Sequence, residues 1–266
     1  MNPAFELKNV SKKFKRSNGG WSNALSGVSF KIQSGEFLAI IGPSGAGKTT
    51  LMRLLNLTLR PSEGEILLEG QNPLNLNASS LRKLRTKTGS IYQQFDIVPS
   101  IRVIHNILSG KLPSWSFLKS FLSLIYPIDI TSVARVAEKV GILECLWEKT
   151  SKLSGGEQQR VAIARTLIQN PSHILADEPV ASVDPSRADS ILILLKKLSE
   201  ENKTTLVVNI HDIALALKFF PRIIGIRNGK IEFDLNSKEI TKEILQKLYE
   251  GDKEFQYESL NKLKNI

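Results

Sequence analysis

The stretch FLAIIGPSGAGKTTLMRLLNL, residues 37–57, contains the pattern that decides the fold. It opens with five apolar residues typical of a buried strand, continues through Gly42-x-x-x-x-Gly47-Lys48-Thr49, and ends in a helical run. Glycines in such a loop let successive backbone N–H groups point at phosphate oxygens, and the following helix adds its positive end. The stretch therefore predicts a phosphate-binding loop between a strand and a helix.

Two side chains of this loop have expected roles. Lys48 is expected to neutralise the β- and γ-phosphates of a nucleotide, and Thr49 to offer its hydroxyl to Mg²⁺. The residues assigned to nucleotide binding are Gly42, Pro43, Ser44, Gly45, Ala46, Gly47, Lys48, Thr49 and Thr50.

An acidic pair follows another apolar strand, ILAD, which ends in Asp177 and is followed by Glu178. An Asp at a strand end can hold Mg²⁺, and the next carboxylate can orient or deprotonate an attacking water. A solvated turn is the simpler interpretation of an Asp-Glu pair. The phosphate loop in the same chain favours the catalytic interpretation.

The segment LSGGEQQRVAIART, residues 153–166, predicts a second anion site. Ser154 and Glu157 fit a capping box at the start of a helix. A capping box does not require two adjacent glycines, and Ser154, Gly155 and Gly156 at a helix N-terminus favour anion binding. One bound nucleotide does not need two such sites in one chain, so the segment indicates a nucleotide held between two copies.

These motifs resemble those of the ATP-binding-cassette (ABC) ATPases, and the resemblance covers nearly the whole chain. It implies that the LSGGE segment of one subunit meets the γ-phosphate held by the other subunit's phosphate loop. It further implies that Gln93, or the adjacent Gln94, links the metal and the lytic water to a helical subdomain. His211 is similar to the histidine that contacts the γ-phosphate.

Three further positions follow from the resemblance. Ser182 and Asp184, in ASVDP, are similar to a loop that contacts the opposite subunit. Phe14 is expected to stack on adenine, with Trp21 as the alternative. Catalysis is thus expected from Glu178, His211, Gln93 and Lys48, and metal binding from Thr49, Gln93 and Asp177.

The order of elements predicts the fold class. Short apolar runs alternate with helical patterns, as at 37–41, 157–169 and 205–210, which predicts a parallel α/β core. Helical periodicity between about 100 and 152 predicts a separate helical subdomain. The resemblance implies a P-loop NTPase core with a parallel sheet, an amino-terminal antiparallel β subdomain and an inserted α-helical signature subdomain.

We expect a single domain over residues 1–266 with three parts. The nucleotide-binding core takes residues 1–95 and 171–236, and the helical subdomain takes 96–170. A carboxy-terminal helix and tail take 237–266, with Ser237 as the helix N-cap and Gly251 as its stop.

Charge and composition narrow the class of partner. The 36 Lys and Arg against 26 Asp and Glu give a net charge of +10, which favours anionic partners. The excess lies in the first half, since residues 1–133 carry 16 basic and 7 acidic residues. No apolar stretch approaches the length of a membrane span. The single cysteine, Cys145, forbids an internal disulfide and is expected to be a small core residue in a reducing compartment.

Within the family, the chain most resembles the ATPase subunits of bacterial phosphonate importers. The resemblance rests on ADEPVASVDP (176–185), the insertion SGKLPSWSFLKSFLSLIYP (109–127) and LKFFPRIIGIRNGKIEFD (217–234). The insertion is expected to form a packed helical hairpin, a docking surface for a permease, or both.

The resemblance implies an ATP hydrolase that drives uptake of a small anion with ATP and Mg²⁺. The implied partners are a second copy, transmembrane permease subunits and, indirectly, a periplasmic solute-binding protein, at the cytoplasmic face of the inner membrane. No nucleic acid is expected. Alternative solutes are phosphite, a phosphate ester, an amino acid or a lipid. An exporter ATPase and a non-transport cassette ATPase are the alternative classes.

Overall fold

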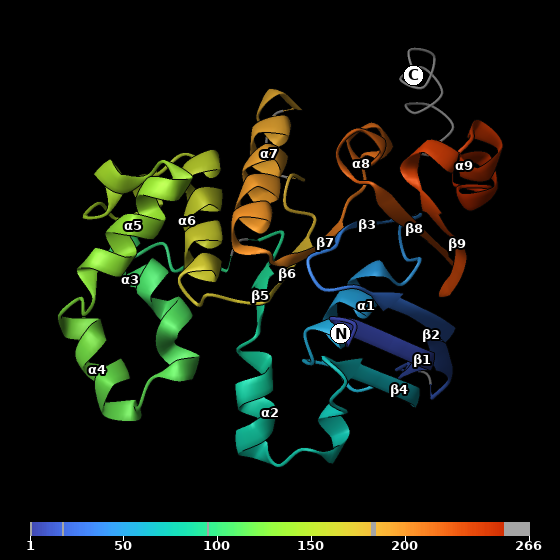
Figure 1. The fold of residues 1–266 in the computed structure, drawn as a ribbon, viewed down its shortest axis with the longest axis horizontal. Helices are drawn as coiled ribbons and strands as arrows, with labels where there is room; N and C mark the ends of the chain where they lie inside the picture. Colours follow the sequence, from blue (N-terminus) through green and yellow to red (C-terminus); the bar gives the residue numbers. More distant parts are fainter. Residues whose placement is uncertain (1, 18, 95, 182–184, 253–266) are drawn as a thin grey trace. The chain divides into compact units, whose positions relative to one another are not determined.

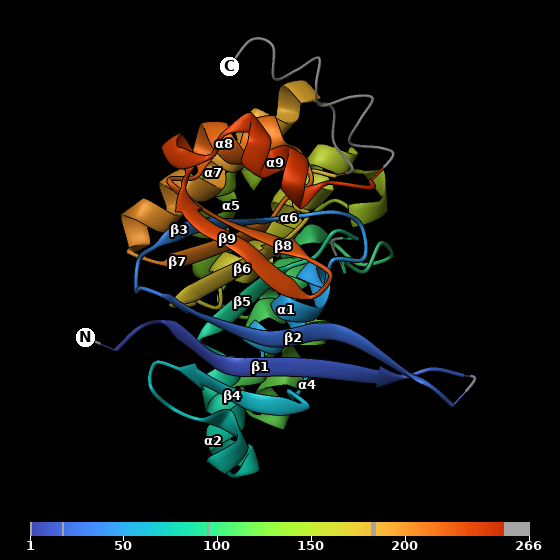
Figure 2. The ribbon, with the colours of Figure 1, turned by 90° about the vertical axis from the view of Figure 1, so that its right-hand side faces the viewer.

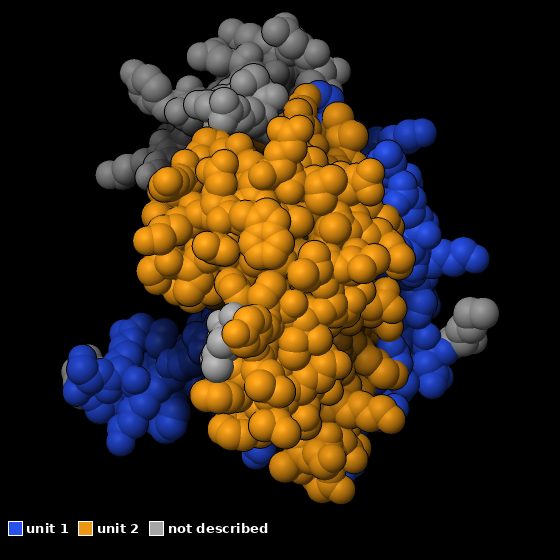
Figure 3. Space-filling model, turned by 90° about the vertical axis from the view of Figure 1, so that its left-hand side faces the viewer, with its two compact units in different colours: residues 1–75, 196–266 blue, residues 76–195 orange. Residues whose placement is uncertain are grey.

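The computed structural model describes residues 2–17, 19–94, 96–181 and 185–252, and Figure 1 traces their fold. The chain divides into two compact units, coloured in Figure 3. Unit 1 takes its residues from both ends of the chain, 1–75 and 196–266, and unit 2 comprises residues 76–195. The expected division into 1–95 with 171–236, 96–170 and 237–266 stays a prediction.

Unit 1 contains a three-stranded antiparallel sheet in the order β2-β1-β4. Its strands are β1 (Phe5–Lys15), β2 (Trp21–Ile32) and β4 (Glu63–Leu68). Apolar and polar residues alternate in β1, so that Phe5 and Leu7 are buried while the intervening Glu6 is not. β2 begins at Trp21, well before its buried residues Val28 and Ile32, because β1 pairs with it out to Lys15.

The second sheet of unit 1 surrounds the strand that precedes the phosphate loop. β3 (Phe37–Ile41) pairs in parallel with β7 (Thr205–Asn209) on one side and β8 (Arg222–Arg227) on the other. β9 (Lys230–Asn236) closes the edge as an antiparallel partner of β8. The apolar runs in β3 and β7 are buried because parallel strands of this kind are covered on both faces.

Helices cover both faces of this sheet. α1 (Lys48–Leu55) contacts β7 and also β2 and β4 of the antiparallel sheet, so it lies between the two sheets. α8 (Ile213–Phe219) contacts β3, and α9 (Lys242–Leu248) contacts β8, and Figure 2 shows both helices on the side opposite to α1. The strand before the phosphate loop therefore has no solvent-facing side.

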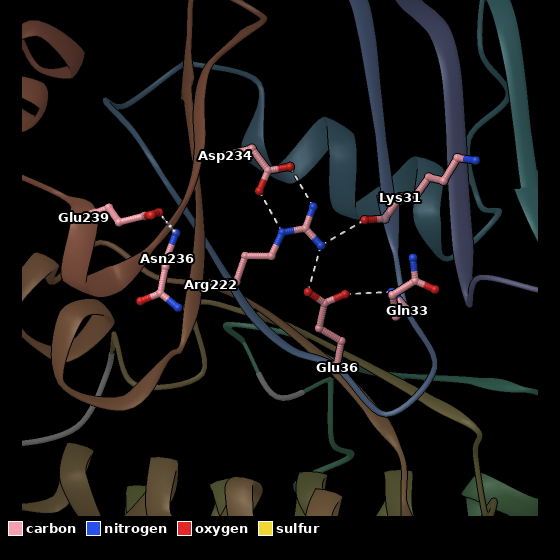
Figure 4. Close-up of polar contacts among 7 residues, drawn as sticks. All are labelled: Lys31, Gln33, Glu36, Arg222, Asp234, Asn236 and Glu239. Carbon is pink, nitrogen blue, oxygen red and sulfur yellow. Dashed lines mark hydrogen bonds and ion pairs between the residues drawn. The ribbon is translucent and has the colours of Figure 1, made fainter.

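A charged cluster joins the two chain segments that make up unit 1, residues 1–75 and 196–266. The guanidinium of Arg222 donates two hydrogen bonds to Asp234, at 2.7 and 2.6 Å, and a third to Glu36 at 2.7 Å (Figure 4). It also donates to the carbonyl of Lys31 at 2.9 Å. The carboxylates raise the pKa of Arg222, with Asp234 the larger cause. The start of β8 is thus fastened to the turn before β3.

Unit 2 combines two parallel strands with helices. β5 (Thr88–Ile91) pairs with β6 (His173–Asp177). The helices are α2 (Ala78–Arg85), α3 (Val103–Leu108), α4 (Phe117–Ile125), α5 (Ile130–Val140) and α6 (Gly155–Leu167), and α7 (Pro185–Asn202) runs from unit 2 into the second segment of unit 1. α3, α5 and α6 contact one another, as Figure 1 shows, and form a helical cluster.

Short 3₁₀ helices complete the described chain. They are η1 (Pro73–Asn75), η2 (Ser109–Ser114), η3 (Leu143–Cys145), η4 (Thr150–Lys152) and η5 (Ser237–Glu239). Within the described ranges, no helix has the length and apolar character needed to span a membrane. The expected α/β class, with parallel strands, an antiparallel β subdomain and a helical signature region, is confirmed.

Three local expectations were wrong. Ser237 does not cap the last helix, because Asn236 caps η5 and Thr241 caps α9. The helical periodicity expected between about 100 and 152 does not continue through residues 142–147 (ILECLW), because Gly141, with its left-handed backbone (φ 73°), ends α5. Cys145 consequently lies in η3 and is only partly buried, instead of belonging to the core.

Candidate functional site

The phosphate loop has the backbone that its glycines predict. Gly42, Gly45 and Gly47 have positive φ angles of 150°, 73° and 107°. A Cβ at Gly42 would lie 2.0 Å from the carbonyl oxygen of Ile226, and one at Gly47 would lie 2.4 Å from that of Ala24. Glycine is therefore required at both ends of the loop by close backbone packing as well as by conformation.

Lys48 is buried and lies against the loop itself. Its ammonium donates to the carbonyl oxygens of Gly42 at 2.6 Å and Pro43 at 2.9 Å. Ser44, Gly45 and Thr49 are exposed. The loop thus combines a buried ammonium group, an open turn of glycine-rich backbone and the start of α1. Together these provide the hydrogen-bond donors that nucleotide phosphates require.

Three segments from elsewhere in unit 1 brace the loop. The N–H of Gly229, in the β8–β9 turn, donates to the carbonyl of Ala46 at 2.9 Å, and Gly229 in turn accepts from Ser26 N–H at 2.8 Å. The N–H of Gly42 donates to the hydroxyl of Tyr249, at the end of α9, at 3.1 Å. Burial raises the pKa of Tyr249, so its hydroxyl stays protonated. The loop conformation therefore depends on the carboxy-terminal part of the chain.

His211 stands at the same edge of the sheet as the loop. In the parallel pair β3–β7, Ile40 lies opposite Asn209, and Ile210 N–H donates to the carbonyl of Ile40 at 3.1 Å. His211 follows directly and is exposed, and Asp212 caps α8 by accepting from Leu215 N–H at 3.1 Å. Because the carboxyl ends of parallel strands meet at one edge, the histidine and the phosphate loop share it.

The two aromatic candidates for adenine stacking lie near the end of the β1–β2 hairpin. Phe14 pairs with Ser22, and Lys15 pairs with Trp21. The ammonium of Lys12 lies 5.3 Å from the centroid of the Phe14 ring, which gives that ring a cation–π partner. Both aromatic side chains are exposed. Phe14 stays the residue predicted to stack on adenine, with Trp21 as the alternative.

In unit 2, the acidic pair and the glutamine lie at the carboxyl ends of two paired parallel strands. Ile91 of β5 lies opposite Ala176 of β6, so Gln93 and Glu178 each follow the paired residues by two positions. Asp177 is the last residue of β6. Glu178 has a positive φ of 53°, which is a strained conformation for a residue with a side chain. Gln93 lies just beyond β5, which ends at Ile91.

The signature segment forms the predicted helix start. Ser154 is the N-cap of α6, and its backbone N–H donates to the carboxylate of Glu157 at 2.8 Å in a complete capping box. Ser154 and Gly155 are exposed, and a Cβ placed on Gly155 would meet nothing within 4 Å beyond its chain neighbours and its own helix backbone. The capping box and an open helix N-terminus therefore coexist, as the sequence predicted.

A buried polar network supports the segment before this helix. The amide of Asn106 donates to the hydroxyl of Thr150 at 2.8 Å and to the carbonyl of Val98 at 2.9 Å. Thr150 donates to the carbonyl of Ile101 at 3.1 Å, and Gln158 of α6 donates to the carbonyl of Leu153 at 3.0 Å. The network fixes the chain that leads into Ser154.

The predicted residues thus fall into two groups. Unit 1 contains Phe14, residues 42–50 and His211, and unit 2 contains Gln93, residues 154–156, Asp177 and Glu178. Ser182 and Asp184 lie outside the described residues. Among the described residues, no group of three or more His, Cys, Asp or Glu side chains could hold a metal. The proposed Mg²⁺ ligands comprise only one carboxylate, which suits a metal bound mainly through nucleotide phosphates.

Sequence reasoning missed the residues that brace the loop. The dipeptide Asn228-Gly229, with φ angles of 50° and 73°, is a hairpin-turn signal that would have located β8 and β9. Tyr249 had no comparable signal, because its contact joins residues 207 positions apart.

Comparison with known sequences gives consistent matches. The family model described as ABC transporter matches residues 25–181. The phosphonates import ATP-binding protein PhnC 3 of Halalkalibacterium halodurans is 42% identical over 244 residues, covering 92% of this chain and 93% of that protein. PhnC 1 of Pseudomonas syringae pv. syringae is 43% identical over 229 residues, covering 86% of each chain.

Solved structures share the fold over most of the chain. The dimeric post-hydrolysis state of the ATP-binding cassette MJ0796, bound to ADP and Pi, is 33% identical with a TM-score of 0.74 and covers 89% of this chain and 100% of its own. CbiO1 from Clostridium perfringens, part of the ABC transporter complex cbiONQ, is 25% identical with a TM-score of 0.77 and full coverage of both chains.

Proposed function

Because this chain belongs to the ABC transporter family, we propose that it is the ATP-hydrolysing subunit of an importer that takes up phosphonate. The observation that supports ATP binding best is the phosphate loop of residues 42–50, with Lys48 beneath it and α1 behind it. The names of the relatives supply the solute. No residue of this chain is assigned to phosphonate itself.

In the proposed mechanism, the loop binds the triphosphate of ATP. Backbone N–H groups of the loop surround the phosphates, and Lys48 exchanges its loop carbonyls for the β- and γ-phosphate oxygens. This exchange replaces two neutral acceptors by charged ones, which strengthens each hydrogen bond. Phe14 stacks on the adenine ring.

Hydrolysis is assigned to the acidic pair and its neighbours. Thr49, Gln93 and Asp177 are proposed to hold Mg²⁺, which neutralises charge on the β- and γ-phosphates when bound. Glu178 orients the water that attacks the γ-phosphate in line, and His211 stabilises the charge that develops on the phosphoryl oxygens.

We assign the second anion site to a second copy of the chain. Ser154, Gly155 and Gly156 of one copy are proposed to contact the γ-phosphate held by the other copy, with Asp184 near the same interface. ATP then joins two copies, and hydrolysis removes the phosphate that joins them. Closure and opening are proposed to drive transmembrane permease subunits, fed by a periplasmic solute-binding protein, at the cytoplasmic face of the inner membrane.

Glu178→Gln tests the catalytic assignment. The amide keeps the size of the side chain but cannot act as a base, so we expect ATP hydrolysis to fall by about a hundredfold or more while ATP binding persists. Gel filtration with ATP should then show a stable dimer. Turnover at the wild-type rate would remove Glu178 from the mechanism.

Lys48→Ala tests the loop. We expect the affinity for a fluorescent ATP analogue to fall at least tenfold, because the charged partner of the phosphates is lost. Unchanged affinity would refute the assignment of the loop. Transport assays with phosphonate, phosphite and phosphate as competing solutes test the proposed solute separately.

A further inference from the structure

We propose that one end of unit 2, formed by α2 and α4, lies on the surface of an anionic lipid bilayer. We name this region the α2–α4 surface and define it by Lys83, Phe117, Leu118, Lys119, Phe121 and Leu122. This inference goes beyond the proposed function, because it assigns a direct lipid contact and does not require ATP hydrolysis.

The first observation is an uncovered apolar helix face. Phe117, Leu118, Phe121 and Leu122 of α4 are 88%, 67%, 54% and 45% exposed. Positions i, i+1, i+4 and i+5 lie on one side of a helix, so these side chains form one continuous apolar face. A polar helix face would be expected if this side of α4 met only water.

The second observation is the charge around that face. Residues 76–129 carry seven Lys and Arg residues and two acidic residues, Asp96 and Asp129, so this segment has a net charge of +5, and Asp129 pairs with Lys111. Lys119 is the only charged residue between Leu112 and Ile128. An apolar helix face with basic residues and almost no acidic ones complements an anionic bilayer, which accepts both kinds of side chain at its interface.

The third observation joins the two helices. The guanidinium of Arg82, on α2, donates to the carbonyl of Pro113 at 2.9 Å, shortly before α4 begins. Figures 1 and 2 both show α2 and α4 at the same end of unit 2. Lys83, next to Arg82, is exposed. The basic helix α2 and the apolar helix α4 therefore lie at one end of unit 2.

The fourth observation is the placement of aromatic residues at the two ends of α4. Trp115 precedes the helix, and the ammonium of Lys119 lies 4.8 Å from the centroid of its ring. Tyr126 follows the helix and is exposed. Trp and Tyr are enriched at the membrane–water interface, where one end of the side chain is apolar and the other is hydrated.

Vesicle binding by the full chain tests the proposal. We would measure co-sedimentation of the purified protein without nucleotide in low salt, with phosphatidylglycerol-containing vesicles and with phosphatidylcholine vesicles. We expect binding to the anionic vesicles only. Phe117→Ser combined with Phe121→Ser should weaken this binding by at least about tenfold. Lys83→Gln with Lys119→Gln should weaken it by about 25-fold, since each basic residue near the surface contributes about fivefold.

Matched controls distinguish binding through the α2–α4 surface from nonspecific hydrophobic or electrostatic binding to vesicles. Leu143→Ser with Ile193→Ser removes exposed apolar side chains elsewhere in unit 2, and Lys230→Gln with Lys238→Gln removes two exposed charges in unit 1. Both control pairs should bind vesicles like the wild type. ATP binding by every variant confirms that the chain has folded.

A spectroscopic readout locates the contact. A chain with Trp21→Phe and Trp147→Phe retains Trp115 as its only tryptophan. Its fluorescence should shift to shorter wavelength with anionic vesicles and be quenched by brominated lipid chains.

Four outcomes would overturn the proposal: no wild-type binding to anionic vesicles, equal loss in the control pairs, no quenching of Trp115, or α4 variants that bind vesicles normally. If the α4 variants bind vesicles normally but fail to associate with permease or to self-associate, the face belongs to that protein interface instead.

Discussion

The hydroxyl of Tyr249 offers a sharp test of how the phosphate loop is held. It accepts the N–H of Gly42 at 3.1 Å from a buried position, and Tyr249→Phe removes the acceptor while keeping the ring. A buried backbone donor without a partner costs about 1–3 kcal/mol. We therefore expect the free energy of unfolding to fall by about 2 kcal/mol and the Tm by about 4–8 °C for a chain of this size.

The same substitution should affect ATP binding. The phosphate loop begins at Gly42. In the variant, the N–H of Gly42 can find a new partner in water only if the loop changes its conformation, and the loop must regain its original conformation before it can bind phosphates. We expect the affinity for a fluorescent ATP analogue to fall by about fivefold, equivalent to about 1 kcal/mol. Tyr126→Phe is the matched control, because Tyr126 is exposed and its Tm should not change. A Tyr249→Phe protein with wild-type Tm and ATP affinity would refute the bracing role.

Three further predictions concern other contacts. Arg222→Ala should lower the free energy of unfolding, measured in urea, by about 2 kcal/mol, because the Asp234 and Glu36 carboxylates lose their shared partner. Arg222→Lys should lower it by an intermediate amount. A loss below about 0.5 kcal/mol for Arg222→Ala would contradict a stabilising role for this cluster. Thr150→Val keeps the side-chain shape but removes the hydroxyl that accepts a hydrogen bond from the Asn106 amide. ATPase activity should therefore fall by about fivefold or more, equivalent to about 1 kcal/mol or more, while the ATP affinity of the monomer stays unchanged. Burial, and next the Glu157 carboxylate, raise the pKa of Cys145, so less thiolate is present at pH 8 than for a free thiol. The pH profile of its iodoacetamide labelling should therefore have a midpoint above the ordinary value of about 8.5, and a midpoint at or below it would contradict the shift.

The phosphate loop and the capped signature helix could be predicted because their information is local. Gly42 to Thr49 specify a backbone path through residue types at fixed spacing, and Ser154 with Glu157 specifies a helix start in four residues. Membership of the family followed from the order of such local motifs.

The missed features depend on contacts that sequence spacing does not reveal. Ser237 and Thr241 both carry a hydroxyl that can cap a helix, so residue type alone did not reveal that Thr241 is the N-cap of α9. Cys145 looked helical and buried because its neighbours continue an apolar period, but Gly141 ends the helix before it. The bond from Gly42 to Tyr249 depends on how α9 packs against β8.

The order of strands in unit 1 has a consequence for synthesis on the ribosome. β3 leaves the ribosome early, but its partners β7 and β8 and the bracing residues Gly229 and Tyr249 follow only after all of unit 2. At typical translation rates the intervening residues 76–195 take about 6–24 s to make. For many seconds, the nascent chain should therefore contain the complete glycine-rich motif without the strands and bracing residues that hold it in its phosphate-binding conformation. Competence to bind ATP would arise as one of the last events of synthesis, which makes it a natural indicator that the whole chain has been translated.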